Sequence, residues 1–309
     1  MLTTTQLEIR KKSIGSSDMA AILGISKWKT GYDVWLEKTG KLLDQTAKDL
    51  SDAADAGNRF EKAVLAWASI ELGKLRRNVY MVAPDKLPIH AFVDAVVIEN
   101  GNPVEAKTGG LFGPLWGEWG EPGSGDVPEP YIIQAHLEML CSEREICHMP
   151  AFLGGRGFQL YHVPLNKDIM DIIEERAVDF WENHVVKDIP PPDTAPSLPI
   201  MSRVNRTPGK RVRVSSKSII AWKQAAEVRK NAEEHEELFK AKMLAELGDG
   251  DISEPVEIEG KPMELVFGET VAMRLDGKLL KEKYPEAAKE CTKETKFRKA
   301  TLRKSKVEK

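Results

Sequence analysis

The pattern of hydrophobic and polar positions first indicates a long amphipathic helix. Within residues 58–72, NRFEKAVLAWASIEL, the apolar side chains of Phe60, Val64, Trp67 and Leu72 recur at near-helical spacing. Such spacing places them on one side of a helix, so this segment is expected to bury one face against a core.

The segments that follow have strand-like patterns. Residues 79–83 and 89–98 are rich in β-branched and apolar side chains, and a third run at 103–107 comes after the dipeptide Asn100-Gly101. Asn-Gly between two apolar runs is a strong signal for a tight hairpin turn. The sequence therefore predicts a group of neighbouring strands directly after the helix.

The rest of the chain divides into helices, hairpins and segments of unusual composition. Residues 109–129 contain seven glycines and three prolines, too many for a regular element, so a long loop is expected there. The other expected elements are two short helices within 15–40, broken at Gly24 and Gly31; a helix at 130–143; a hairpin at 149–163; a helix at about 166–186; a long charged helix at about 216–247; a strand pair at about 256–274; and a terminal basic segment.

A cluster of prolines marks a change of domain. Pro190, Pro191, Pro192, Pro196 and Pro199 lie close together, and proline interrupts regular structure. We therefore expect one domain over residues 1–189, a proline-rich linker over residues 190–201, and a helix plus strand-pair extension with a basic tail over residues 202–309.

Composition narrows the class of protein. With 41% hydrophobic and 30% charged residues, the chain is typical of soluble globular proteins. No run approaches the roughly 18 apolar residues of a membrane span, and the N-terminal segment lacks the apolar core of a secretory signal. The three cysteines, Cys141, Cys147 and Cys291, form no C-x-x-C pair, so a disulfide framework and a zinc or iron–sulfur site are not expected, and a reducing cytoplasm is the default.

Charge is separated along the chain despite a net charge of only −3. Residues 202–217 carry six basic residues and no acidic one, residues 233–259 carry ten acidic residues and two lysines, and residues 289–309 carry nine basic and three acidic residues. The basic stretches are either solvated surface, or contacts to a DNA backbone or to an acidic partner.

The hairpin VDAVVIENGNPVEAKTG, residues 93–109, combines polar chemistry with strand formers. A two-residue Asn-Gly turn would set Val96 opposite Glu105 and Asp94 opposite Lys107, and opposed residues share one face of a sheet. The side chains of Asp94, Glu105 and Lys107 are therefore expected on the same face. A three-residue turn would move Asp94 to the other face.

Two interpretations of these three side chains remain open at this point. One is a cross-strand ion pair between Asp94 and Lys107, worth about 0.2–1 kcal/mol. The other is a divalent-metal centre, because two carboxylates on one partly buried face repel each other and a single lysine neutralises only one. Oxygen ligands favour Mg²⁺ or Mn²⁺, which activate water and neutralise a phosphate, and a lysine beside them can stabilise the attacking hydroxide.

The motif resembles the PD-(D/E)XK nuclease superfamily, whose signature is an acidic residue on one strand and (D/E)-x-K on the next. Asp94 and Glu105-Ala106-Lys107 match it, with Val93 in place of the usual proline. The segments IGSSDMAAILGISKWKTGYDVWLEKTG, GNRFE and WGEPGSGDVPEPYIIQAHLEML occur around it in the expected order. Together they resemble the YqaJ-type viral recombinase domain, the family of phage lambda exonuclease, over about residues 10–185.

The resemblance implies a fold and an activity. The fold would be α/β (α+β), a restriction-endonuclease-like core with a central mixed β-sheet flanked by helices, followed by the C-terminal extension. The activity would be Mg²⁺-dependent 5′→3′ exonuclease digestion of double-stranded DNA ends in the host cytoplasm. The partners would be a single-strand annealing protein and two further copies in a homotrimeric ring. An endonuclease with the same centre, or a non-catalytic DNA-binding protein, are the other functions to distinguish.

The resemblance also assigns roles to residues. Asp94, Glu105 and the carbonyl of Ala106 would bind metal, Glu61 would hold or orient a second metal, and Lys107 would activate the water. Gln134 and Tyr131, three residues apart on one helix face, would position the water and the scissile phosphate. Glu61 could instead be a surface glutamate beside Lys62, and Tyr131 could simply be packed.

Further residues would bind DNA. Arg10, with Ser16 and Ser17, would hold the 5′-terminal phosphate, which suits an arginine and hydroxyls at a helix N-terminus, although Ser17 could be only a helix cap. Trp116 and Trp119 would either split the duplex end by stacking on bases or pin their loop to the core. His136 stands where the family often repeats a glutamine, and no role is assigned to it.

Overall fold

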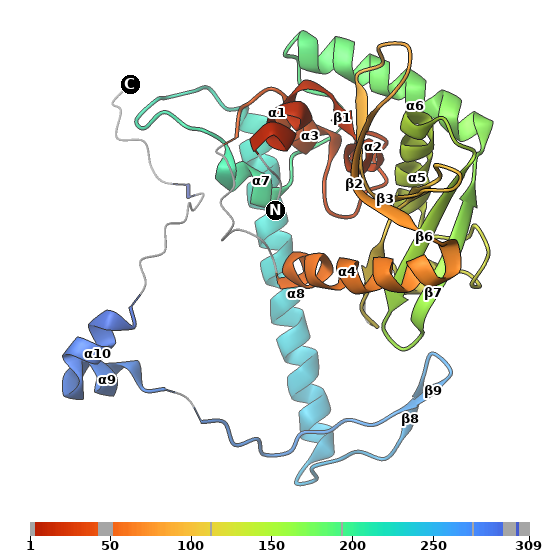
Figure 1. Ribbon diagram of the computed structural model, residues 1–309. Coiled ribbons are helices and arrows are strands. Elements are labelled where there is room, and N and C mark those ends of the chain that lie inside the picture. The colour runs from red at the N-terminus through yellow and green to blue at the C-terminus, as the bar shows by residue number, and fades with distance from the viewer. Residues whose placement is uncertain are drawn as a thin grey trace. The chain divides into compact units, whose positions relative to one another are not determined.

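The computed structural model describes residues 4–42, 52–111, 113–192, 194–273, 275–292 and 301–302. It divides into two compact units, residues 1–206 and residues 207–309, which we call unit 1 and unit 2. Figure 1 shows their helices and strands. Most of the tail rich in lysine and arginine, residues 293–300 and 303–309, lies outside the described residues.

Unit 1 is built on a mixed seven-stranded sheet. Its strands are β1 (Ile14–Gly15), β2 (Leu75–Val82), β3 (Ile89–Val97), β4 (Pro103–Val104), β5 (Lys107–Gly109), β6 (Ile146–Leu153) and β7 (Gly157–Pro164). Strand β3 pairs antiparallel with β2 along one edge, and along the other it pairs with β1 and β4 at its two ends. Strand β6 joins β4 and β5 in parallel and forms an antiparallel hairpin with β7.

Helices cover this sheet, which confirms the predicted α/β fold class with a central mixed sheet. They are α1 (Thr4–Lys12), α2 (Ser16–Ile22), α3 (Gly31–Lys38), α4 (Asp52–Leu72), α5 (Glu129–Ser142), α6 (Lys167–Phe180) and α7 (Leu198–Arg203). Helix α2 packs against α3, α5 and α6, while α4 packs against β2, β5, β6 and β7. Figure 1 shows α4 crossing one end of the strands, away from the group formed by α1, α2 and α3.

Helix α4 confirms the first amphipathic prediction, although it begins six residues earlier than expected. Its Val64, Leu65 and Ala68 are buried. Phe60, however, is 48% exposed and stacks on Phe152 of β6, with ring centroids 5.7 Å apart. The buried face is therefore narrower than the sequence pattern indicated.

The proline-rich segment is a correction to the predicted domain boundaries. Helix α7 was not expected, and its Ile200 is 7% exposed within the core of unit 1. The backbone N–H of Ser197 donates to Asp33 Oδ1 at 2.9 Å, and Leu42 forms a bridge with Val204. Residues 194–206 are therefore part of unit 1, because side-chain burial and these bonds hold the prolines against it.

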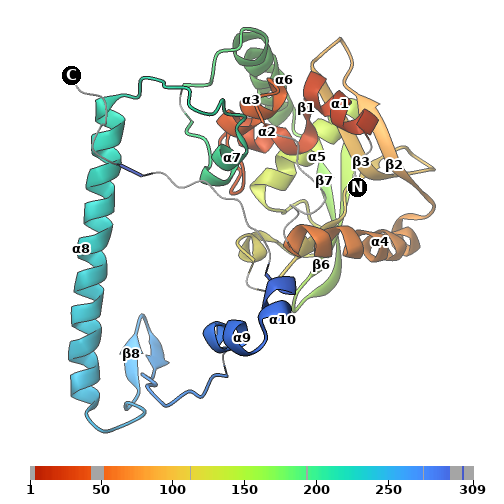
Figure 2. The ribbon, with the colours of Figure 1, turned by 90° about the vertical axis from the view of Figure 1, so that its left-hand side faces the viewer.

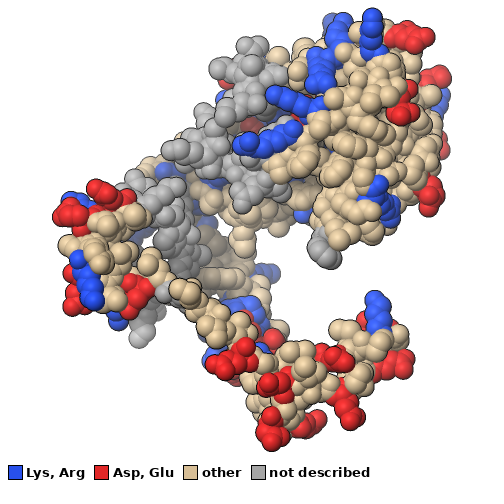
Figure 3. Space-filling model, turned by 60° about the horizontal axis from the view of Figure 1, so that its bottom comes forward, with Lys and Arg blue, Asp and Glu red and all other residues tan. Residues whose placement is uncertain are grey.

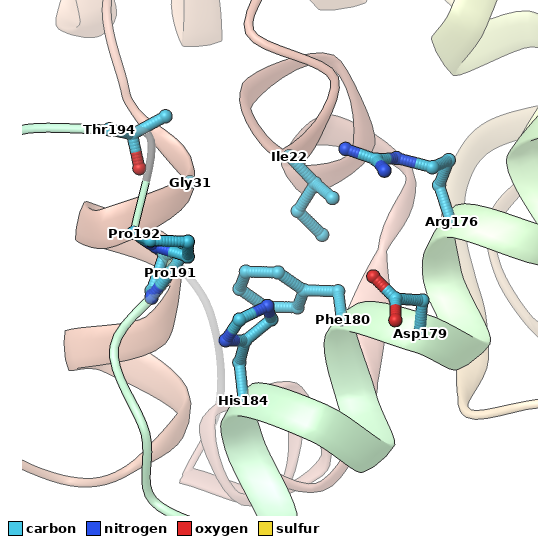
Figure 4. A pocket seen from close by; sticks show the side chains of 9 residues that line it. All are labelled: Ile22, Gly31, Arg176, Asp179, Phe180, His184, Pro191, Pro192 and Thr194. Atoms are coloured by element: carbon cyan, nitrogen blue, oxygen red, sulfur yellow. The ribbon is translucent and has the colours of Figure 1, made fainter.

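A pocket of about 270 Å³ lies where this segment crosses α2, α3 and α6. Figure 4 shows Pro191 and Pro192 on one side and Phe180 and His184 on the other, with the Arg176 side chain directed toward Ile22. In the described part of the chain, the buried hydroxyl of Thr194 at the pocket's edge has no hydrogen-bond partner. This pocket is formed within unit 1.

Unit 2 contains α8 (Ser216–Leu247), β8 (Val256–Ile258), β9 (Lys261–Met263), α9 (Gly277–Lys283) and α10 (Pro285–Glu290). Helix α8 confirms the predicted long helix and buries none of its residues. Figure 2 shows it as a straight rod, and Figure 3 shows acidic and basic side chains on the molecular surface. The strand pair is shorter than predicted, and α9 and α10 were not expected. Within the described residues, no helix is both long and apolar enough to cross a membrane.

Two histidines that face each other across the β6–β7 hairpin are expected to make stability depend on pH. His148 is 8% exposed, and its Nδ1 lies 2.8 Å from Nδ1 of His162. Burial and then the neighbouring His162 lower the pKa of His148 to about 4. In the unfolded chain a histidine has a pKa of about 6.5. As the pH falls, the unfolded state therefore binds a proton at this residue before the folded state does.

The free energy of unfolding is therefore expected to fall by roughly 3 kcal/mol between about pH 6.5 and pH 4 because of His148. Urea unfolding across this range should show a shallower decline for His148→Gln than for the wild type. The exposed His235 offers the control, since His235→Gln should leave the decline unchanged. Equal slopes for wild type and His148→Gln would contradict the prediction.

Candidate active site

The structure brings Asp94, Glu105 and Lys107 together. Lys107 Nζ lies 2.8 Å from Glu105 Oε1, and the backbone N–H of Ala106 donates to Asp94 Oδ2 at 2.9 Å. The face shared by these side chains is the one that the hairpin pattern predicted. The predicted pairing is wrong by two residues, however, because Ala95 pairs with Val104 and Val96 with Pro103.

The turn explains both results. Val97 N–H donates to the carbonyl of Asn102, and Gly101 N–H donates to the carbonyl of Val97, so the loop comprises the four residues 98–101. A four-residue loop shifts the register by an even number relative to a two-residue loop, and an even shift keeps every side chain on its face. Continuing the observed register places Asp94 across from Glu105.

A gap between β4 and β5 gives the two carboxylates their positions. Val104 pairs with His148, and Lys107 pairs with Ala151, so β4 and β5 form one line along β6 that is interrupted at residues 105 and 106. Glu105 N–H still donates to the carbonyl of His148 at 3.0 Å. The N–H of Ala106 is left for Asp94, which fixes that carboxylate beside Glu105.

Helix α5 contributes two further side chains, Gln134 and Tyr131, to this group of residues. Gln134 Oε1 accepts from Lys107 Nζ at 2.8 Å, and Gln134 Nε2 donates to Glu105 Oε1 at 2.6 Å. Lys107 Nζ also lies 4.6 Å from the centre of the Tyr131 ring. Lys107 is thus held by a carboxylate, an amide and an aromatic face. We call Asp94, Glu105, Lys107, Tyr131 and Gln134 the active-site cluster.

Burial and neighbouring charges shift the pKa values of Asp94 and Lys107 in this cluster. Burial and then the Glu105 carboxylate raise the pKa of Asp94 to about 8, against the opposing effects of Lys107 and the Ala106 N–H. Burial works against the charge of Lys107, yet Glu105 outweighs it and the pKa of Lys107 is raised. Lys107 is therefore an ammonium group at neutral pH, suited to stabilise negative charge.

The residues present fit a hard divalent cation. Glu105 is 7% exposed, and its buried Oε2 has no hydrogen-bond partner among the residues that the structure describes. Together with Asp94 it offers two carboxylates, and Mg²⁺ is commonly bound by one or two carboxylates and several waters. Within the described residues, no group of three or more histidine, cysteine or acidic side chains is placed to hold a metal.

The role of Glu61 in holding or orienting a second metal stays a prediction. Glu61 lies half-buried on α4, near enough for its charge to raise the pKa of Asp94, but it does not join Asp94 and Glu105 in a preformed three-carboxylate site. From this position the charge of Glu61 acts on Asp94.

Sequence reasoning missed Glu138, which lies under the cluster. It is fully buried, and its Oε1 accepts from Gln134 Nε2 at 3.0 Å. Burial and then Glu105 raise its pKa well above the ordinary value. The signal that could have revealed it is the i, i+4 spacing from Gln134, which places both side chains on the same helix face.

Comparison with known proteins finds a family model that matches the part of the chain holding this geometry. Residues 6–145 match the YqaJ-like viral recombinase domain. Over this range the chain is similar to that family. A Bacillus subtilis (strain 168) protein named "Uncharacterized protein YqaJ" is 28% identical over 306 residues, covering 94% of this chain and 90% of the relative.

Solved structures with similar folds include an alkaline exonuclease from Laribacter hongkongensis, at 16% identity and a TM-score of 0.47, over 60% of this chain and 94% of that one. A phage-related exonuclease from Haemophilus somnus 129PT has 14% identity and a TM-score of 0.39, over 57% and 96%.

The YqaJ-like domain also brings Arg10 and Ser17 together, with Arg10 Nη2 donating to Ser17 Oγ at 3.3 Å. The helix cap preceding α2 is Gly15, whose N–H donates to Asp18, so Ser17 is not the cap. Ser16 is 7% exposed, and its contact with a phosphate stays a prediction.

Asp18 anchors this end of the YqaJ-like domain. Its buried carboxylate forms ion pairs with Lys29 at 2.7 Å and Lys38 at 2.6 Å. Although burial opposes its charge, the two lysines hold the pKa of Asp18 well below its usual range. Lys38 of α3 also donates to the carbonyl of Arg10. Its bonds to Asp18 and Arg10 therefore attach the segment that carries Arg10 and Ser17 to α3.

The two loop tryptophans of the YqaJ-like domain face inward. Trp119 is 5% exposed and packs against Tyr131 and Tyr161. Trp116 is half-buried, donates from Nε1 to the carbonyl of Gly154 at 2.8 Å, and lies under Arg156. Of the two alternatives, these contacts correspond to pinning the loop. The buried Trp119 indole offers no free face for stacking on a base, whereas the stacking alternative for the half-buried Trp116 stays a prediction.

His136 has a structural role in the YqaJ-like domain. Its Nδ1 lies 2.8 Å from the carbonyl of Ile132, and its Nε2 accepts from the N–H of Asn166 at 2.9 Å. The ring therefore ties α5 to the start of α6 and uses both nitrogens in doing so. No catalytic role remains for it.

Proposed function

We propose that this chain is a Mg²⁺-dependent exonuclease that degrades one strand of linear double-stranded DNA from its 5′ end, in recombination of the viral type. The observation that carries the proposal is the meeting of Asp94, Glu105 and Lys107 beside Gln134, with Glu105 Oε2 buried and, among the described residues, unpartnered. The similarity of residues 6–145 to the family supports the same class of activity.

The chain's own groups would divide the work of phosphodiester hydrolysis. Lys107, held by Glu105 and Gln134, would stabilise a hydroxide nucleophile and the charge that develops on the phosphate. Tyr131 closes one side of this ammonium group and limits the access of bulk water. Asp94, fixed by the Ala106 N–H, and Glu105 would hold the metal, with the Ala106 carbonyl as a third oxygen donor.

A bound Mg²⁺ would lower the pKa of a water ligand and neutralise negative charge on the phosphate. Mn²⁺ should substitute, because it also accepts oxygen ligands. The proposal extends to a single-strand annealing protein as partner and to a homotrimeric ring around DNA. Light scattering that found only monomer would remove the trimer from the proposal without affecting the chemistry.

The test is digestion of linear duplex DNA labelled separately at each 5′ and 3′ end, with Mg²⁺, with Mn²⁺ and with EDTA. The expected result is release of nucleotides from the 5′ end only, and no release in EDTA. Closed circular DNA is the control and should stay intact. Cutting of the circle would instead indicate an endonuclease with the same centre, and no cutting of either DNA would contradict the proposal.

Arg10→Ala is expected to remove most of the preference for 5′-phosphorylated ends. An arginine with a neighbouring hydroxyl recognises a phosphate through charge-assisted hydrogen bonds, and Arg10 is the cation that contacts Ser17. Initial digestion rates on 5′-phosphate and 5′-hydroxyl ends measure the effect. Lys12→Ala removes a positive charge from the same helix and should keep the preference. An equal loss of rate on both ends would argue against the phosphate role of Arg10.

A further inference from the structure

Trp28 has an unusual position in the loop between α2 and α3. It is 58% exposed, and its ring lies nearly parallel to that of Tyr131, with centroids 6.5 Å apart and 15° between the planes. Tyr131 in turn lies 4.6 Å from Lys107 Nζ. An exposed indole therefore stands one aromatic ring away from the lysine of the active-site cluster.

The exposure of Trp28 is unusual within unit 1. Trp35 and Trp119 are each 5% exposed, and Trp67, Trp116 and Trp181 are half-buried. Burying a large aromatic side chain contributes substantially to stability, so leaving one in solvent forgoes that contribution. Among the described tryptophans of unit 1, Trp28 alone presents most of its surface to solvent.

The loop holds Trp28 in place through its neighbours. Lys27 Nζ donates to Glu118 Oε1 at 2.6 Å and to the carbonyl of Pro114 at 3.1 Å. On the other side, Lys29 Nζ donates to Asp18 at 2.7 Å and to Glu37 at 2.5 Å. The Ser26 hydroxyl accepts from the N–H of Trp28 and of Lys29. The indole is thus presented from a segment anchored on both sides, which lowers the conformational entropy cost of binding a ligand.

We propose that Trp28, with Tyr131 beside it, forms a stacking site for an unpaired base of the DNA strand that enters the active-site cluster. The inference rests on the proposed nuclease function for the identity of the ligand. Stacking on an indole is tolerant of sequence because every base has a flat π face, and this suits an enzyme that must degrade any sequence. Trp28 takes the role that the buried Trp119 cannot fill.

The position of Trp28 favours a nucleobase over a protein partner. Lys107, which would bind the scissile phosphate, is separated from Trp28 only by the Tyr131 ring. A phosphate at Lys107 therefore brings an attached base into the neighbourhood of the indole. Lys27 and Lys29 on either side of Trp28 are both committed to carboxylates, so recognition here would come from the ring and not from charge.

The test measures binding to a partly resected duplex whose recessed 5′ strand ends in 2-aminopurine, with Ca²⁺ in place of Mg²⁺ and phosphorothioate linkages to prevent cutting. The wild type should quench the 2-aminopurine fluorescence. Trp28→Ala should abolish the quenching and weaken binding by about tenfold, given the usual strength of base–aromatic stacking. Trp28→Phe should retain most of both effects. Trp222→Ala removes an indole that is 49% exposed in unit 2 and should behave as the wild type.

A second probe, with an abasic residue in place of the terminal nucleotide, isolates the base. On this probe wild type and Trp28→Ala should bind equally. Equal binding of the two proteins to the 2-aminopurine probe, or an equal loss on both probes, would overturn the stacking site. Digestion of linear duplex by the wild type with Mg²⁺ is read separately: absence of digestion contradicts the proposed function, whereas normal digestion together with unaltered binding by Trp28→Ala overturns only the stacking inference.

Discussion

Lys107→Ala is expected to abolish digestion of linear duplex DNA while leaving affinity for DNA largely intact. The ammonium group is the one cation among the five residues of the active-site cluster, and it is directed by Glu105 and Gln134. Groups that stabilise charge only in the transition state typically contribute about 10²–10³-fold or more to the rate. Single-turnover digestion and anisotropy binding measure the two quantities separately.

The variant needs a structural control, because Lys107 also neutralises Glu105 in a buried setting. Thermal unfolding will show whether Lys107→Ala remains folded. Lys74→Ala removes an exposed lysine from the same unit and should digest DNA at the wild-type rate. A folded Lys107→Ala variant that digests linear duplex at the wild-type rate would disprove the role of Lys107.

Asp94→Asn is expected to remove both digestion and the stabilisation of the protein by Mg²⁺. Asp94 and Glu105 are the two carboxylates that would hold the metal, and a ligand that binds only the folded state raises its stability. Differential scanning fluorimetry with EDTA and with increasing Mg²⁺ should show a rise in Tm for the wild type and none for Asp94→Asn. Asp171→Asn, an exposed change on α6, should respond as the wild type.

The same variant makes a prediction in the absence of metal. In the folded protein the pKa of Asp94 is raised to about 8, whereas an aspartate in the unfolded chain has a pKa of about 3.9. The folded state therefore binds the proton of Asp94 more tightly than the unfolded state does. The contribution of Asp94 to stability is therefore present at low pH and is lost as the pH rises from about 4 through 8. In EDTA, Asp94→Asn should lose less Tm than the wild type over this range. A steeper loss of Tm in Asp94→Asn than in the wild type would contradict the raised pKa of Asp94.

The chain's local patterns determined more of the active-site cluster than of its surroundings. The strand period of two fixed which face Asp94, Glu105 and Lys107 share, and an even change of loop length left that face unaltered. The Asn-Gly signal placed the turn correctly but not its length, because the choice between loops of two and four residues depends on how β3, β4 and β6 pair.

Burial was the property that the sequence determined least. Trp28 and Trp119 are both tryptophans in loops, yet one is 58% and the other 5% exposed. Both contact Tyr131, but Trp119 also packs against Tyr161 in a buried cluster. The prolines after residue 189 indicated a linker, but Ile200 and the bond from Ser197 to Asp33 attach that segment to unit 1. Such contacts join residues more than a hundred positions apart, which no local pattern records.

The sequence by itself determined the strand–turn–strand unit, the helices α4, α5 and α8, and the residue types of a metal-dependent nuclease. These depend on side-chain periodicity and turn chemistry, which act between near neighbours. Only the tertiary structure decided that Gln134 accepts a hydrogen bond from Lys107 and donates one to Glu138. The same holds for the exposed position of Trp28 beside Tyr131. The physical reason is that these contacts form when α5 and the α2–α3 loop pack on the sheet, and packing depends on the shape of the whole core.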